Sequence, residues 1–409
     1  MNADLQINNS ANPKARYVTW EPSPCRARLT NSSGVIGPVA NVTITSVSAS
    51  ATGGAVRFRK TATGPSSASI TLQLPITGAS VPFFTVGVFG RPSKADGDVR
   101  IEARSGTTVI GQVRVMVRIR RNANALSAPE IARLVAAFAQ LNNQGAGRFA
   151  DFRNMHTNAG SPQAHGAPGF LPWHRAYLLD LERELQAIDS SVALPYWRFD
   201  QAAPTLFTTN FIGVSNANGT VQFSASNPLQ FWVTDGVPGI NRSPSFNTNT
   251  GFAGGINEAQ TLALGAGQYR PFRSQMEQNP HGRAHTSFGG FISSIPTAAR
   301  DPLFFFLHCN VDRLWAKWQR QFGRFDSATA ASYDSTPSPI GHNLPDTMWP
   351  WNGITGPPRP PTAPGGALAG APTVAAPGPQ PRVKDCLDYQ GRVAAAARMG
   401  FDYDDVANP

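Results

Sequence analysis

Six of the seven histidines in this 409-residue chain fall into two groups of three. In the first group, eight residues separate each histidine from the next, and the second group lies further along the chain. Any fold of this chain therefore has to accommodate two sets of three imidazoles. The two groups are His156, His165 and His174, and His281, His285 and His308.

The first group follows helical patterns. Phe149, Phe152 and His156 share one face of a predicted helix. Pro172 is typical of a first helical turn, and His174 in that turn continues an apolar face. We therefore expect both histidines on the buried sides of helices. The apolar residues that continue the face of His174 are Tyr177, Leu178, Leu181 and Leu185.

The second group also follows helical patterns. Asn279 and Pro280 resemble a helix cap and a first helical residue, which would place His281 and His285 one turn apart on the same side. His308 lies in the middle of a further apolar stripe, after a start signal at residues 301–302. Four helices are thus predicted to offer histidines to one centre. The stripe consists of Phe304, His308, Val311, Trp315 and Trp318.

A metal explains these histidines better than a plain core does. A single histidine on an apolar face is usually a hydrogen-bonded core residue, but six buried imidazoles are costly to satisfy. Neutral imidazole suits Zn, Cu, Fe or Ni. No Asp or Glu lies between His156 and His174, which disfavours Mg, Mn and di-iron sites. A zinc hydrolase would have a glutamate between His281 and His285, and none is present there. A pair of three-histidine sites across a helix bundle favours paired copper ions.

The first third of the chain differs in charge and in pattern. Residues 1–122 carry fifteen Lys and Arg against five Asp and Glu, whereas residues 123–409 carry twenty of each. About seven short segments with period-two alternation predict an antiparallel β-sandwich over residues 1–122. Arg114, Arg118 and Arg120 are expected on its solvated face. An anionic partner is the alternative explanation of this charge, but no nucleic-acid-binding motif is present, so we expect no nucleic acid partner.

Residues 123–409 are predicted to form a mainly α-helical domain, a four-helix bundle around a dinuclear copper site with long loops. Ser127 and Glu130 match a capping box at the start of its first helix. A Pro/Gly/Ala-rich segment over residues 353–381 is expected to have no regular structure.

Two strings in this domain resemble the copper signatures of the tyrosinase family, which comprises tyrosinases, catechol oxidases and molluscan haemocyanins. They are HGAPGFLPWHRAYL over residues 165–178 and DPLFFFLHCNVDRLW over residues 301–315, and the resemblance covers roughly residues 125–409. It implies that the first histidine group binds one copper ion, that the second binds another, and that O₂ is the co-substrate. The expected function is a type-3 copper phenol oxidase that converts o-diphenols to o-quinones and also hydroxylates monophenols. The alternatives are a catechol oxidase without hydroxylase activity and a haemocyanin-like oxygen carrier.

The resemblance also implies roles for residues around the second group. Glu277 occupies the position of a glutamate that orients a water to deprotonate the phenol, although it could be an exposed residue at a helix end. Gly282 stands where efficient monophenol hydroxylases often have Asn, which disfavours strong hydroxylation. Thr286 and Ile295 occupy positions that shape the substrate entrance.

Two more residues are expected to support the metal ligands. Phe304 resembles an aromatic residue that packs on the ligand histidines. Asp312 resembles an acceptor for an imidazole N–H, or it pairs with Arg313. The family motifs do not explain the β-domain of residues 1–122, for which we consider a lid over the copper site or a docking module.

The sequence also yields expectations about location and partners. No stretch approaches ~18 consecutive apolar residues, so no membrane span is expected. Residues 1–5 show no signal-peptide pattern, which predicts a cytoplasmic protein. Small phenols are the expected partners, and the sequence leaves open both a copper-loading partner and the oligomeric state.

Overall fold

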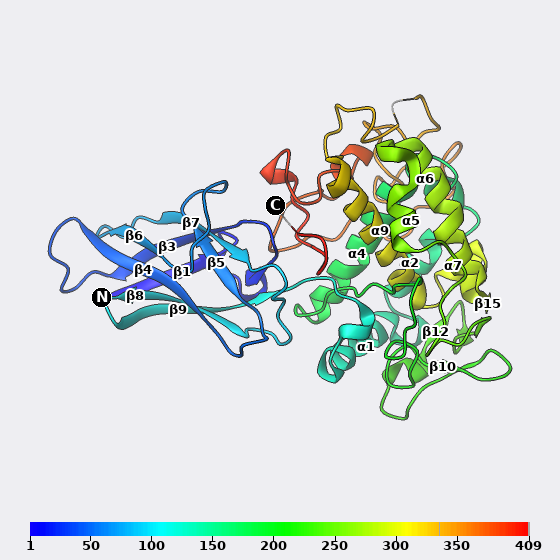
Figure 1. Cartoon of the computed structure of the whole chain (residues 1–409), viewed down its shortest axis with the longest axis horizontal. Helices are drawn as coiled ribbons and strands as arrows, with labels where there is room; N and C mark the ends of the chain where they lie inside the picture. The colour runs from blue at the N-terminus through cyan, green and yellow to red at the C-terminus, as the bar shows by residue number, and fades with distance from the viewer. Residues whose placement is uncertain (335, 408–409) are drawn as a thin grey trace. The chain divides into compact units, whose positions relative to one another are not determined.

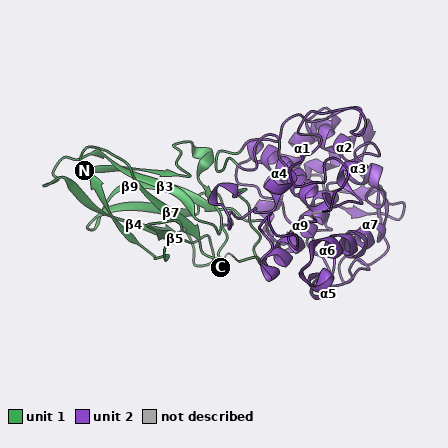
Figure 2. Cartoon of the chain, turned by 90° about the horizontal axis from the view of Figure 1, so that it is seen from above, with its two compact units in different colours: residues 1–119, 371–375, 399–409 green, residues 120–370, 376–398 purple. Residues whose placement is uncertain are grey.

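The computed structural model describes residues 1–334 and 336–407. These residues form two compact units, shown in different colours in Figure 2. Unit 1 contains Met1–Ile119, Ala371–Ala375 and the described residues from Met399 on, and unit 2 contains Arg120–Gly370 and Ala376–Arg398. The division lies three residues before the predicted boundary at 122.

Part of the chain's end belongs to unit 1, although the sequence assigned all of residues 123–409 to the second domain. Trp20, which is buried, explains this return of the chain. Its indole N–H donates to the carbonyl oxygen of Tyr403 at 2.9 Å, and its backbone N–H donates to the carboxylate of Asp402 at 3.0 Å. These contacts fix the tail within unit 1.

Unit 1 is built from two sheets that share one apolar core (Figure 1). One sheet has the strand order β1-β3-β7-β5 and the other the order β2-β9-β8-β4-β6. The strands are β1 (Asn2–Ile7), β2 (Tyr17–Val18), β3 (Ser23–Asn31), β4 (Val39–Ser48), β5 (Val56–Arg59), β6 (Ile70–Pro75), β7 (Val81–Gly87), β8 (Val99–Ser105) and β9 (Thr108–Val117).

The alternating segments of the sequence are the strands that line this core. In the pair β4 and β6, Val42 lies opposite Leu72 and Ile44 opposite Ile70, and all four are buried. Period-two alternation places every second side chain on one face of a sheet, and here that face meets the other sheet.

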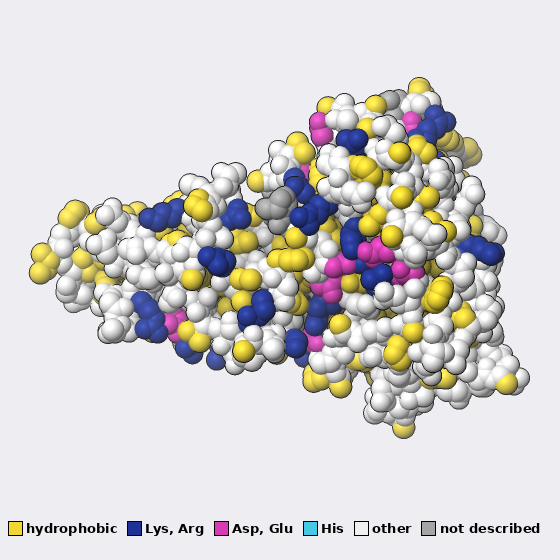
Figure 3. Space-filling view, viewed as in Figure 1, with side chains coloured by type: hydrophobic (Ala, Val, Ile, Leu, Met, Phe, Trp, Pro, Cys, Tyr) yellow, Lys and Arg dark blue, Asp and Glu magenta, His cyan; other side chains and the backbone are white. Residues whose placement is uncertain are grey.

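Two details of the β-domain prediction are wrong. The domain is not antiparallel throughout, because β2 pairs in parallel with β9. Two of the three arginines expected on the solvated face are buried, namely Arg118 and Arg120. Arg118 lies over the ring of Tyr17, 4.5 Å from its centroid, and Arg120 belongs to unit 2. A cation on an aromatic face offsets part of the cost of its burial. On the face shown in Figure 3, the Lys and Arg side chains of unit 1 form separate groups and no continuous patch.

Unit 2 is helical with long loops. Its longest helices, α4 and α9, pack against each other, and α1 packs against α4. The helices are α1 (Ala128–Asn142), α2 (Phe149–Met155), α3 (Ser161–Ala164), α4 (Phe170–Ile188), α5 (Glu258–Ala263), α6 (Tyr269–Met276), the π-helix η6 (Glu277–Gly282), α7 (Arg283–Thr286), α8 (Ile295–Ala298) and α9 (Leu303–Phe322). Short strands in the loops are β10 (Val214–Ser215), β11 (Val221–Gln222), β12 (Val233–Thr234), β13 (Val237–Pro238), β14 (Arg242–Pro244) and β15 (Phe288–Gly290).

Local signals explain where the main helices begin. The carboxylate of Glu130 accepts the backbone N–H of Ser127 at 2.9 Å, as the predicted capping box requires. The carboxylate of Asp301 accepts the backbone N–H of Leu303 at 2.9 Å at the start of α9, and it also pairs with the buried Arg242 at 2.6 Å. Both helices are therefore anchored at their first turns.

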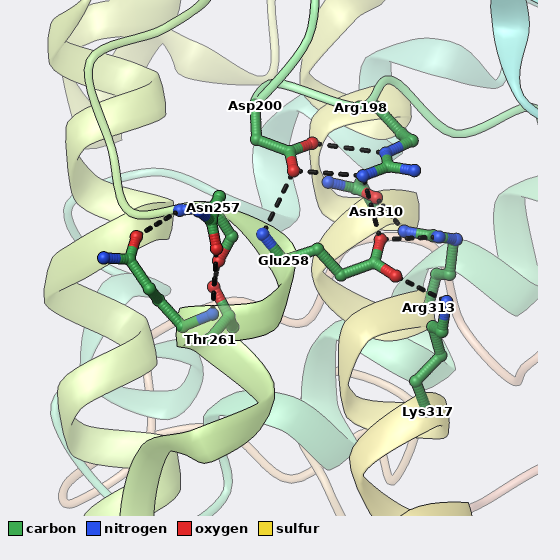
Figure 4. A network of polar contacts seen from close by, with 9 residues as sticks. Arg198, Asp200, Asn257, Glu258, Thr261, Asn310, Arg313 and Lys317 are labelled. Carbon is green, nitrogen blue, oxygen red and sulfur yellow. Dashed lines mark hydrogen bonds and ion pairs between the residues drawn. The ribbon is translucent and has the colours of Figure 1, made fainter.

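A network of charged side chains fastens α5 to α9 (Figure 4). Glu258, in the first turn of α5, accepts from Arg313 at 2.7 Å and from Lys317, both of which lie on α9. Arg198 approaches the same carboxylate at 3.3 Å and also pairs with Asp200 at 3.0 Å. Arg313, for which the sequence suggested Asp312 as a partner, therefore pairs with Glu258.

The remaining segments agree with their composition. Residues 353–381 contain no helix or strand, as expected. Among the described residues, the structure has no helix with the length and apolar character needed to cross a membrane.

Candidate metal centre

The two histidine groups form two compact triads in unit 2. In each triad, one ring nitrogen of each histidine lies within 4.8 Å of those of the other two. The chain thus brings together residues that are far apart in sequence. The triads are His156, His165 and His174, and His281, His285 and His308.

One histidine of the first triad lies within a helix, and the other two directly follow the ends of helices. His174 lies within α4. His156 directly follows the last residue of α2, and His165 directly follows the one-turn helix α3 with an extended backbone (φ −134°, ψ 164°). The predicted helical face of His156 therefore ends one residue before it.

The second triad combines one long helix with two short helical segments that follow each other along the chain. His308 lies within α9, His281 in the π-helix η6 and His285 in α7. The predicted helix start after Asn279 is present in the backbone, because Asn279 has the extended angles of a residue that precedes a helix (φ −145°, ψ 116°), but its side chain does not cap the following turn. Its side-chain oxygen accepts the backbone N–H of Ile256 at 3.0 Å instead.

Backbone carbonyl oxygens orient five of the six imidazoles. A carbonyl oxygen can only accept a hydrogen bond, so Nδ1 carries the proton in each of the five, and Nε2 keeps its lone pair for a metal. The acceptors are the carbonyl oxygens of Ile295 for His156 (3.1 Å), Ser161 for His165 (3.3 Å), Phe170 for His174 (2.8 Å), Glu277 for His281 (2.7 Å) and Ile292 for His285 (2.7 Å).

The distances between these nitrogens suit a bound metal ion. The Nε2 atoms of His156 and His165 are 3.3 Å apart, and Nε2 of His308 lies 3.3 Å from that of His281 and 3.2 Å from that of His285. Tetrahedral ligands with metal–nitrogen bonds of about 2.0 Å lie about 3.3 Å apart. Nε2 of His174 is buried without a hydrogen-bond partner, so it too is available to a metal. The donor set therefore fits a pair of metal ions that prefer imidazole.

Burial keeps these rings neutral. It lowers the pKa of all six imidazoles, and for His165 and His285 the lowered pKa is about 4. A neutral imidazole has the free electron pair that a metal requires. The triads are therefore ready to bind metal at neutral pH without first losing protons.

A pocket with a volume of about 300 Å³ adjoins both triads. All four residues that the family resemblance singled out for catalysis or substrate access line it. Thr286 and Ile295 are exposed, with Ile295 at 44%. The lining residues are His156, His165, Glu277, His281, Gly282, His285, Thr286, Ser293, Ile295 and Ala298.

Glu277 has its carboxylate at this pocket and is largely buried. One oxygen accepts the backbone N–H of Gly166 at 2.7 Å, and the other accepts from Arg273 at 2.9 Å. Burial raises the pKa of Glu277, and these two hydrogen bonds oppose the rise. Glu277 is therefore not the exposed helix-end residue that the sequence offered as an alternative.

The two residues predicted to support the ligands have different surroundings. The ring of Phe304 lies 4.2 Å from that of His308 and 4.6 Å from that of His156, between centroids. Asp312 pairs with Arg175 at 2.6 Å and with Arg120 at 3.3 Å. Five of the imidazole Nδ1–H groups use backbone carbonyls, and Nδ1 of His308, one turn before Asp312, is buried without a hydrogen-bond partner, so the predicted contact between Asp312 and an imidazole is absent. Two buried guanidinium groups attract its carboxylate more strongly than a neutral ring does.

Sequence reasoning missed several parts of the site. Ser293 and Ala298 line the pocket without belonging to either signature string. The carbonyl oxygens of Ile292 and Ile295 orient histidines, but any residue type supplies a carbonyl oxygen. No sequence signal could have identified these groups.

Comparison with known proteins gives a consistent picture. Residues 146–321 match the family model described as the common central domain of tyrosinase. The tyrosinase of Streptomyces glaucescens is 34% identical over 270 residues, which is 57% of this chain and 92% of that protein. The tyrosinase of Streptomyces antibioticus is 32% identical over 273 residues, 58% of this chain and 94% of that protein. Hemocyanin 2 of Megathura crenulata is 31% identical over 250 residues, 57% of this chain and 7% of that protein.

The family assignment has three supports that agree. They are the two signature strings, the two histidine triads and the near-complete coverage of two tyrosinases. This chain belongs to the tyrosinase family of copper-dependent oxidoreductases, which use a dinuclear copper cofactor.

Proposed function

We propose that the protein is a type-3 copper phenol oxidase, which oxidises o-diphenols to o-quinones with O₂ and also hydroxylates monophenols. The pocket beside the triads carries this proposal, because its volume of about 300 Å³ is at the lower end for small-molecule sites and four of the histidines line it. We assign the surrounding bundle to α2, α4, the α6–α7 segment and α9. We assign the first copper to His156, His165 and His174 and the second to His281, His285 and His308.

Copper, when bound, supplies the centre that binds O₂ and accepts electrons. Each catechol gives up two electrons and two protons, so two catechols reduce one O₂ to two waters. The protein holds five of the six Nε2 atoms toward the metal through a hydrogen bond at Nδ1, and packing against His174 and Phe304 holds the ring of His308. Ile295 and Thr286 flank the substrate ring at the entrance. Glu277 takes up the phenol proton, because burial raises its pKa and makes it a stronger base.

Oxidation of catechols without hydroxylation is the second candidate, and Gly282 favours it. Gly282 lines the pocket but has no side chain that could help to hold a water beside Glu277. A reversible oxygen carrier is a third candidate, suggested by the similarity to Hemocyanin 2. The exposed pocket residues Thr286 and Ile295 count against the carrier, since a carrier needs no entrance for substrate.

O₂ uptake by the copper-loaded protein, with tyramine in one cell and the matching catechol in another, tests the proposal. Uptake with both substrates is the expected result. Uptake with the catechol alone would establish the second candidate. A protein that holds two coppers and takes up no O₂ with either substrate would contradict both enzymatic functions.

For unit 1 we keep two hypotheses, a lid over the copper site and a docking module. A truncation that tests them has to remove residues 399–409 together with 1–119, because Trp20 holds the tail. Increased turnover of a folded truncated protein would support the lid, and unchanged turnover would contradict it.

A further inference from the structure

Like His156, which follows the end of α2, His165 lies outside the helices, whereas the other four triad histidines lie within helical segments. His165 follows the one-turn helix α3, and the segment up to α4 passes through Gly166 with φ +73° and ends at Gly169. We call residues 162–169, which include the last three residues of α3, the His165 loop. Since it lacks the regular backbone hydrogen bonds of a long helix, its position depends on contacts with other parts of unit 2.

The ring of His342 contacts both ends of this loop. Its Nδ1 accepts the backbone N–H of Gly169 at 3.2 Å, and its Nε2–H donates to the carbonyl oxygen of Pro162 at 3.0 Å. His342 is 1% exposed. A neutral imidazole has one donor and one acceptor, which are the two groups used here. His342 is the histidine that belongs to neither triad.

The fit between His342 and the loop is close. A Cβ atom at Gly169 would lie 2.5 Å from Nδ1 of His342, although the backbone of Gly169 is helical (φ −67°) and would accept any residue. Glycine at 169 therefore permits the approach of the ring. On the other side of His342, its carbonyl oxygen accepts the hydroxyl of the buried Tyr333 at 2.7 Å.

Neighbouring contacts hold the same loop. Gln163 accepts from the buried Arg359 at 2.6 Å. The hydroxyl of Tyr269 donates to the carbonyl oxygen of Pro168 at 2.6 Å. His342 is the group among these that bonds to both ends of the loop, so it fixes the span within which His165 lies.

We propose that His342 is a positioning residue for the first copper, which holds the His165 loop so that His165 faces His156 and His174. The inference rests on the proposed function, in which these three histidines bind copper. Loss of groups that orient a metal ligand typically weakens metal binding by about ten- to a hundredfold. We expect an effect of this size at the first copper and none at the second.

The test is a titration of the metal-free protein with Cu(II) against a competing chelator. His342→Phe keeps a ring but removes both hydrogen bonds to the loop, whereas the control Tyr333→Phe removes one buried hydrogen bond behind His342 and leaves the loop contacts intact. We expect about ten- to a hundredfold weaker binding at one of the two copper sites in His342→Phe, and unchanged binding in Tyr333→Phe. Combining His342→Phe with His308→Phe, which leaves only the first triad complete, should show the same fold-change and so assign the site.

Gly169→Ala provides a second test if His342→Phe fails to fold, because its methyl group would displace the His342 ring. Wild-type copper affinities at both sites in a folded His342→Phe or Gly169→Ala protein would overturn the role of His342. Equal weakening in Tyr333→Phe would also overturn it, since a general loss of stability would then explain the effect. If the wild-type protein itself binds no pair of copper ions, the proposed function fails instead.

Discussion

The imidazole rings of His174 and His308 stack face to face, with centroids 4.2 Å apart and ring planes 8° apart. One ring belongs to each triad, and the two residues lie on α4 and α9, which pack against each other. The contact between the two longest helices thereby sets the two triads side by side. It also gives a way to remove a ligand while keeping the packing.

His308→Phe should retain an aromatic ring against His174 while removing the nitrogen donor. We expect one copper ion fewer per chain and at least about a hundredfold less O₂ uptake with catechol, because loss of a ligand should cost at least as much as loss of its orienting group. Copper analysis after dialysis and an oxygen electrode measure both effects. Phe305→Leu on the same helix is the control and should retain both coppers. Full copper content in His308→Phe would contradict the ligand assignment.

Glu277→Gln should separate monophenol from diphenol oxidation. The amide keeps an acceptor for the backbone N–H of Gly166 but cannot take up the phenol proton. We expect turnover of tyramine to fall by about a hundredfold and turnover of catechol to change much less. Equal losses for both substrates would indicate that Glu277 only holds the loop in place.

Gly282→Asn should raise monophenol hydroxylation relative to catechol oxidation. The backbone at Gly282 is helical (φ −59°), and an added Cβ would approach one group, the carbonyl oxygen of Glu277, at 3.3 Å. An amide that holds a water through one hydrogen bond worth about 1 kcal/mol would increase the ratio of the two rates about fivefold. Gly282→Ala adds the Cβ without the amide and should leave the ratio unchanged. The same increase in both variants would rule out a role for the amide.

Asp312→Asn should affect stability and leave metal binding unchanged. The substitution gives the buried Arg175 a neutral partner in place of a carboxylate, whereas the buried Arg120 keeps its pairing with Glu182 at 2.8 Å. We expect the free energy of unfolding to fall by about 3 kcal/mol in urea titrations. Copper affinity should stay at the wild-type value, whereas a drop of about tenfold or more would show that Asp312 does orient a ligand.

The metal-free protein should lose stability as the pH falls below 6.5. The folded protein keeps His165 and His285 neutral down to about pH 4, whereas in the unfolded chain they take up protons near the ordinary value of 6.5. Within this window the unfolded state binds more protons, so each histidine lowers the free energy of unfolding by about 1.4 kcal/mol per pH unit. Urea titrations at about pH 7.5, 6 and 5 measure the slope. Equal stability across this range would contradict the buried neutral state.

The sequence by itself determined the chemistry of the site and the class of each unit. Histidine is the residue type that binds copper as a neutral ligand. The histidines of both triads lie within the two signature strings or the helical patterns from which the sequence predicted a metal site. The alternation at Val42, Ile44, Ile70 and Leu72 identified core strands, because a sheet with one buried face imposes a period of two.

The tertiary structure alone decided which groups orient and surround these ligands. Asp312 has the correct spacing from His308 for a contact on one helix face, yet two guanidinium groups brought by other segments bind it. Any residue type can supply the carbonyl oxygens that accept from the imidazoles. His342 contacts the His165 loop although it lies more than a hundred residues further along the chain. Local sequence fixes helices and strands through short-range sterics and periodicity, whereas buried polar groups find their partners only when the whole chain has packed.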